Sequence, residues 1–64
     1  MRVALNINLI GEGDAFQTGN HGLETARILR HMIDHIEDGM EGRFDLRDVN
    51  GNWVGTAVFE RVAE

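Results

Sequence analysis

The chain begins with apolar and polar positions in strict alternation. Apolar side chains on one side are those of Val3, Leu5, Ile7 and Leu9, and the other side carries Arg2, Ala4, Asn6 and Asn8. A period of two predicts a β-strand over residues 2–10 with one buried face. Residues 11–20 hold three glycines together with Asp, Thr and Asn, which is the chemistry of a loop. We expect the one large apolar residue of this loop, Phe16, to lie over one end of the core.

From residue 23 to residue 38 the apolar period changes to 3.6, which predicts an amphipathic helix. The apolar sector, roughly 120° wide, consists of Ala26, Leu29, Met32, Ile33 and Ile36. Asn20 or Thr18 can cap its beginning, and Gly39 or Gly42 can end it in a left-handed conformation. Ile28 lies outside the sector, near Glu24, His31 and His35, so we expect it at the rim of the core or against a partner.

Two further alternating runs flank Asn50-Gly51, the strongest short signal for a β-hairpin. A two-residue turn there pairs Asp48 with Trp53, Leu46 with Gly55 and Phe44 with Ala57. The face directed at the helix is then Phe44, Leu46, Trp53, Ala57 and Phe59. A three-residue turn with a bulge is the alternative, and it would turn Val54, Thr56 and Val58 inward. The first register is favoured because Gly55 and Ala57 leave room for Leu46 and Phe44.

The pattern predicts an α+β domain over residues 1–64, with element order β-α-β-β and one helix packed on a three-stranded sheet. An all-antiparallel sheet with strand order 2-3-1 is favoured over a parallel pairing of the first two strands. The sheet face away from the helix would hold a mixed set: Val54, Thr56, Val58 and Ala4 beside Arg43, Asp45 and Arg47. Such a half-apolar face, and an exposed strand edge, are surfaces for a dimer or a partner.

Composition adds two expectations, one about oligomeric state and one about location. The chain has 64 residues, no Cys, and a net charge of −5, so neither disulfides nor thiolate metal sites can stabilise so small a core. We therefore expect a homodimer. The sequence contains no long apolar run and no recognisable signal peptide, so we expect a cytoplasmic protein that does not enter a membrane.

Several segments together resemble a known class of proteins: Asp14-Ala-Phe16, Glu24-Thr-Ala-Arg-Ile-Leu29, Ile36-Glu-Asp-Gly39 and Leu46-Arg-Asp-Val-Asn-Gly-Asn-Trp-Val-Gly55. The chain is similar to small, uncharacterised proteins of phages and prophages that end in a Leu-Arg-Asp-x-Asn-Gly-Asn-x-Val-Gly hairpin. This resemblance implies a phage accessory product acting in the host cytoplasm. It brings no catalytic residue with it.

Motifs for chemistry are weak. His31 and His35 have the i, i+4 spacing of zinc ligands, but a third ligand is not evident. Asp48-x-Asn50-x-Asn52 begins like a calcium loop, but Trp53 and Phe59 occupy the positions that require Gly and Glu. Gly11-x-Gly13 lacks the rest of a phosphate-binding motif, and the chain has neither Cys nor Ser as a nucleophile. We expect no enzyme activity, no metal and no cofactor.

The strongest local anomaly is a cluster of carboxylates at the end of the helix, where the helix dipole is already negative. Its members are Asp34, Glu37, Asp38 and Glu41. We expect this cluster to contact a partner protein, such as a nucleic-acid-handling or defence protein of the host, by imitating phosphates in the manner of an anti-CRISPR inhibitor.

Two alternatives stay open. All six basic residues are Arg, so a dimer that brings together Arg43 and Arg47 of two chains could bind nucleic acid. The negative net charge makes direct binding the weaker hypothesis. A structural accessory protein of the phage particle is the other alternative.

Overall fold

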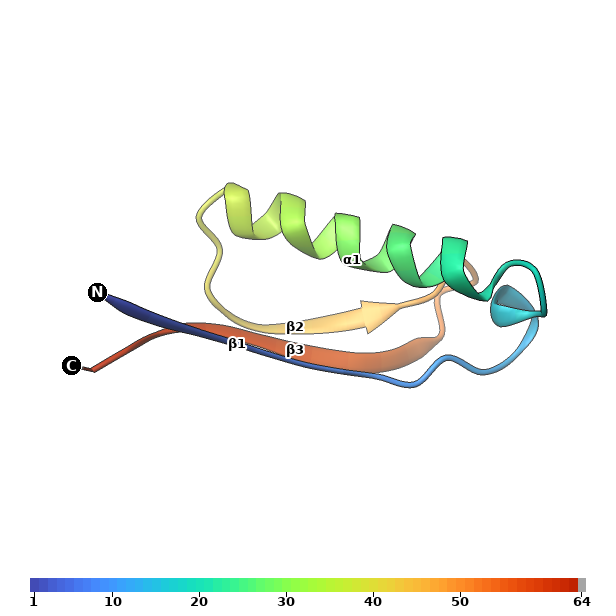
Figure 1. The fold of residues 1–64 in the computed structure, drawn as a ribbon, viewed down its shortest axis with the longest axis horizontal. Coiled ribbons are helices and arrows are strands. Elements are labelled where there is room, and N and C mark those ends of the chain that lie inside the picture. Colours follow the sequence, from blue (N-terminus) through green and yellow to red (C-terminus); the bar gives the residue numbers. More distant parts are fainter. Residues whose placement is uncertain (64) are drawn as a thin grey trace.

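The computed structural model describes residues 1–63 and has one helix lying on a three-stranded sheet (Figure 1). Its elements are β1 (Arg2–Leu9), the short 3-10 helix η1 (Asp14–Phe16), α1 (His21–Glu37), β2 (Gly42–Arg47) and β3 (Trp53–Val62). The strand order is β1-β3-β2, and both pairings are antiparallel. The predicted β-α-β-β order and the antiparallel sheet are therefore confirmed.

Helix α1 ends as its glycine predicts. Gly39 has a φ of 92°, a left-handed conformation that costs glycine little. The N–H of Gly39 donates to the carbonyl of Ile36 at 3.0 Å, and the N–H of Met40 donates to that of His35 at 3.1 Å. These two bonds form a Schellman motif, which turns the chain back toward the sheet. At the other end Asn20 occupies the N-cap position without a side-chain hydrogen bond.

The buried side of α1 differs from the predicted sector. Ile28 is 3% exposed and Met32 4%, whereas Ile33 is 47% exposed. Burial thus follows a line of residues four apart, and the expectations that Ile33 lies in the core and Ile28 at its rim are wrong. The reason is the position of α1, which lies closest to β2 (Figure 1), so the flank with Leu29 and Ile33 turns toward the less covered β1 side.

The hairpin has the predicted register in its strands but a different loop. Leu46 pairs with Gly55 and Phe44 with Ala57, as expected, whereas Arg47 and not Asp48 is opposite Trp53. The loop contains three residues, because the Asp48 N–H donates to the Asn52 carbonyl at 2.9 Å and Gly51 has a φ of 84°. A bulge between Leu46 and Arg47 then restores the register. The loop shifts the strand pairing by one residue, and the bulge shifts it back by one.

This bulge decides which side chains enter the core. Trp53 is 57% exposed and Val54 is 7% exposed, so the prediction of Trp53 inside and Val54 on the outer face is wrong. The extra residue of a bulge reverses the alternation of side chains locally. The core consists of Ile28, Met32, Leu46, Val54 and Ala57, with Leu9, Phe16, Leu29, Ile36 and Phe44 packed against it. The expected position of Phe16 beside the core is thereby confirmed.

Candidate functional site

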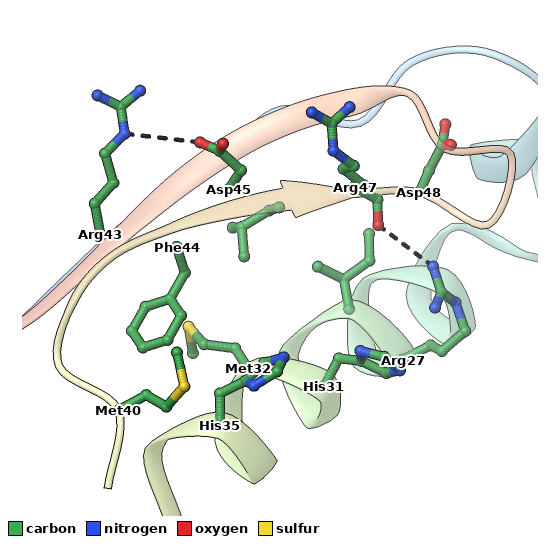
Figure 2. A pocket seen from close by; sticks show the side chains of 12 residues that line it. Arg27, His31, Met32, His35, Met40, Arg43, Phe44, Asp45, Arg47 and Asp48 are labelled. Carbon is green, nitrogen blue, oxygen red and sulfur yellow. Dashed lines mark hydrogen bonds and ion pairs between the residues drawn. The ribbon is translucent and has the colours of Figure 1, made fainter. Parts of the chain in front are cut away.

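A groove runs between α1 and the outer edge of β2 (Figure 2). Its volume is about 480 Å³, which lies within the range of ligand-binding pockets. The lining residues come from α1, from the turn after it, and from β2: Arg27, Ile28, His31, Met32, His35, Met40, Arg43, Phe44, Asp45, Leu46, Arg47 and Asp48. Helix and strand are both rigid elements, so this groove is formed in advance of any ligand.

Aromatic and sulfur-containing side chains form one end of the groove. The rings of His35 and Phe44 are stacked, with centroids 6.2 Å apart and planes inclined by 26°. His31 meets His35 edge-on at the same centroid separation, 6.2 Å. Figure 2 shows Met40 beside Phe44, and Met40 is half exposed. This end can therefore receive an apolar side chain from outside.

The backbone of β2 is open along the groove, because β2 is an edge strand. In antiparallel pairs, successive residues direct their N–H and C=O groups alternately toward and away from the partner strand. The Asp48 N–H bonds to Asn52 of the opposite arm, so Leu46 and Phe44 also point toward β3. The N–H and C=O groups of Arg43 and Asp45 therefore point away from the sheet.

Side chains of β2 alternate in the same way. Phe44 and Leu46 lie on the helix side, and Figure 2 shows Arg43, Asp45 and Arg47 on the other side of the strand. Arg43 Nε lies 3.7 Å from Asp45 Oδ1. Arg47 donates to the Gly51 carbonyl at 3.1 Å. Asp45 thus lies between the two arginines of the predicted nucleic-acid surface in sequence and offsets part of the charge of Arg43.

Glu24 holds Arg27, which lines the other end of the groove (Figure 2). Its carboxylate accepts from Arg27 Nε at 2.8 Å and from Arg27 Nη2 at 3.0 Å, and it accepts the Val49 N–H at 2.6 Å. The Arg27 hydrogen bond holds the pKa of the Glu24 carboxyl below its usual value, and the Val49 N–H acts in the same direction, against the effect of burial. Arg27 also donates to the Arg47 carbonyl at 3.4 Å. The start of α1 is thus fixed to both β2 and the hairpin loop.

Asp48 organises the hairpin loop. It is buried, and its Oδ1 accepts the N–H groups of Asn50 and Asn52, both at 2.9 Å. The Asp48-x-Asn50-x-Asn52 pattern therefore forms a loop held by its own first side chain, as Asp does in turns. Over residues 1–63 no group of three or more His, Cys, Asp or Glu side chains is placed to hold a metal ion.

The four predicted partner-binding carboxylates lie at or just beyond the end of α1, and all are exposed: Asp34, Glu37, Asp38 and Glu41. The first three have the i, i+3, i+4 spacing of neighbours on a helix surface. Glu41 accepts from Arg61 Nε at 3.1 Å, so its charge is partly offset. Glu41 of this cluster directly follows Met40, which lines the groove.

The predicted outer sheet face is only partly formed. Val54 belongs to the core, whereas Thr56 and Val58 are half-buried and pair with Asp45 and Arg43 of β2. The remaining face is therefore more polar than the sequence suggests.

A different apolar surface lies on the β1 side. Val3, Leu5 and Ile7 are between 44% and 57% exposed, although they pair with β3 residues whose side chains face α1. The sequence places these side chains in the core. They are exposed because α1 covers the β2 side of the sheet, an arrangement that one-dimensional periodicity does not encode.

None of the helices within residues 1–63 has the length and apolar character needed to cross a membrane. No protein-family model, no curated protein and no solved structure matches the chain. The candidate site is therefore described by its own contacts and geometry alone.

Proposed function

We propose that this chain is a non-catalytic protein-binding module that takes up an extended segment of a partner along β2. The observation that carries the proposal is the open backbone of Arg43 and Asp45 beside a formed groove. A peptide added there as a fourth strand gains main-chain hydrogen bonds, and the groove accepts its alternate side chains. Helix α1 supplies the second wall, which makes the register of such a strand specific.

Chemistry of the groove defines the partner segment. Phe44 and Met40 favour an apolar side chain, and Asp34 and Asp38 at the adjoining helix end favour a lysine or arginine nearby. The net charge of −5 attracts basic proteins over a longer range. We propose a basic partner, and, in the phage setting that the resemblance implies, a nucleic-acid-handling or defence protein in the host cytoplasm. The module would act as its inhibitor or modulator.

The module is also proposed to act as a homodimer, on account of its surface and shape. Its accessible surface is 4725 Å² for 7.2 kDa, whereas a compact monomer of that mass exposes about 4100 Å². Its radius of gyration is 12.9 Å, against about 10.7 Å for a compact chain of this length. The excess of roughly 600 Å² approaches the ~800 Å² that each partner buries in a standard interface.

A proline at position 45 tests the strand-addition proposal. Asp45→Pro removes the outward N–H and places a ring where the added strand would run, while edge strands tolerate proline. Asp45→Ala is the matched control, because it removes the same carboxylate and keeps the N–H. The probe is a library of short synthetic peptides that combine an apolar residue with nearby arginine or lysine.

We expect such peptides to bind the native chain and to shift the amide resonances of Arg43 and Asp45. Asp45→Ala should retain affinity within a few-fold, and Asp45→Pro should lose it. Equal binding by the two variants, or no binding by any peptide of this class, would contradict strand addition.

Neutralising the acidic cluster tests the chemistry of the partner. A variant carrying Asn or Gln at all four positions, namely Asp34, Glu37, Asp38 and Glu41, should bind basic peptides more weakly, and the difference should shrink at high salt. Unchanged affinity at low salt would remove the cluster from the proposed contact surface.

A further inference from the structure

The outer edge of β1 has open backbone groups. The Ile10 N–H donates to the Val54 carbonyl at 2.9 Å, so Ile10 and, by alternation, the even-numbered residues of β1 point toward β3. The N–H and C=O groups of the odd-numbered residues therefore point away from the sheet. These residues are Val3, Leu5, Ile7 and Leu9.

Side chains on this edge are apolar at the same positions. Val3, Leu5 and Ile7 are about half exposed on the helix side. The same three residues therefore carry both unpaired backbone groups and exposed apolar side chains. β1 pairs with β3 over eight residues without a register shift, and the chain has no proline and no lysine. Bulges, prolines and lysines are features that usually prevent pairing at an edge strand. β1 has none of them, and its one charged residue, Arg2, lies at the end of the strand.

We infer that a second copy of this chain pairs with β1, antiparallel and about a two-fold axis at Asn6. This inference rests on the proposed homodimer and specifies its interface. A two-fold axis through an antiparallel strand pair makes the interface self-complementary.

The centre at Asn6 follows from the pattern of β1. It places Val3 opposite Leu9 of the partner subunit and Leu5 opposite Ile7 of the partner subunit, so each of the four large apolar residues of the strand gains an apolar neighbour. A centre at Leu5 would leave Leu9 opposite Met1 of the partner subunit, outside the strand. A centre at Ile7 would place Val3 opposite Gly11 of the partner subunit.

The resulting dimer has one continuous six-stranded sheet. β1 and β2 lie on opposite sides of β3 (Figure 1), so joining the two β1 strands leaves both β2 edges at the outside. Each dimer would then offer two grooves at its far ends. A bivalent partner could engage both and gain avidity.

Cysteine cross-linking tests this register, because the native chain has no Cys. Asn6 directs its backbone toward β3, so the two Asn6 residues would form a non-hydrogen-bonded pair with Cα atoms about 4.5 Å apart. That separation suits a disulfide. Asn8→Cys is the matched control, since the two copies of residue 8 would lie four positions apart, about 13 Å at 3.3 Å per residue.

We expect sedimentation equilibrium of the native chain to give twice the chain mass, and mild oxidation to convert most of Asn6→Cys, but little of Asn8→Cys, into covalent dimer. A native chain that stays monomeric overturns the homodimer itself. A native dimer in which Asn8→Cys cross-links as well as Asn6→Cys, or in which Asn6→Cys does not cross-link, overturns only the β1 interface. Peptide binding to the β2 groove is measured separately, so its failure is distinguishable from both.

Discussion

The substitution Ile28→Val tests the position of α1 on the sheet. Ile28 is 3% exposed and belongs to the core cluster, whereas helix periodicity places it outside the buried sector. Ile33→Val is the matched control, because it removes the same methylene from a helical residue that is 47% exposed. Both variants keep a β-branched residue in the helix, so their helix propensities change similarly.

Removing a buried methylene from isoleucine costs about 0.5–1.5 kcal/mol, and a surface change usually stays within about 0.5 kcal/mol. A core of this size rarely supplies more than about 3–5 kcal/mol, so the loss at Ile28 is a substantial fraction of the total. We expect the Tm of Ile28→Val to fall by about 4–8 °C for each kcal/mol lost. The Tm of Ile33→Val should change much less.

The measurement is thermal unfolding followed by circular dichroism at 222 nm, with all chains at one concentration because dimer formation makes Tm concentration-dependent. Urea unfolding gives the free energies independently. If Ile33→Val were destabilised as much as Ile28→Val, the helix would be rotated on the sheet from the position described. The groove between α1 and β2 would then lose its geometry.

Two further predictions concern the contacts that hold the groove in place. In Gly55→Ala the new Cβ would overlap the Asn8 carbonyl and lie 2.9 Å from Leu9 Cα, so β1 and β3 must separate. We expect this variant to lose cooperative unfolding as followed by circular dichroism. A native-like unfolding transition would contradict the close packing of β1 against Gly55. In Glu24→Gln the contribution of the ionised carboxylate is removed. The pKa of Glu24 in the folded chain lies below its ordinary value. The carboxylate therefore stabilises the fold fully at pH values above the ordinary pKa of about 4.3, and this stabilisation is lost as the pH falls through the folded-state pKa. The native chain should therefore be more stable than Glu24→Gln at pH 7 in urea unfolding, with a gap that narrows under acid; a gap independent of pH would exclude the carboxylate from this role.

Local patterns determined much of the fold. Alternation over residues 2–10 and around Asn50-Gly51 predicts β1, β2 and β3, and a 3.6-residue period predicts α1. The pairings of Leu46 with Gly55 and of Phe44 with Ala57 also follow from the sequence, because large side chains require small ones opposite. Such features depend on neighbours in the chain or on simple complementarity of size.

The hairpin loop shows where local reasoning reaches its limit. Asn50-Gly51 correctly marks a turn with a left-handed glycine, but the carboxylate of Asp48 selects a three-residue loop by accepting the N–H groups of Asn50 and Asn52. A bulge then returns the strands to register and turns Val54 inward. The three-residue loop shifts the pairing by one residue and the bulge shifts it back. The alternation of side chains beyond the bulge is therefore the same as with a two-residue loop, and it does not reveal either feature.

The candidate site was decided only by tertiary structure. The composition and the acidic cluster predict a protein-binding surface, but they do not reveal a groove between α1 and β2. That groove exists because α1 lies toward one edge of the sheet, where Glu24 is hydrogen-bonded to Val49, 25 positions away in sequence. The same displacement leaves Val3, Leu5 and Ile7 uncovered on β1. Periodicity identifies which side chains are apolar, whereas the position of a helix across a sheet depends on long-range packing, and that position determines which of them remain exposed for a partner.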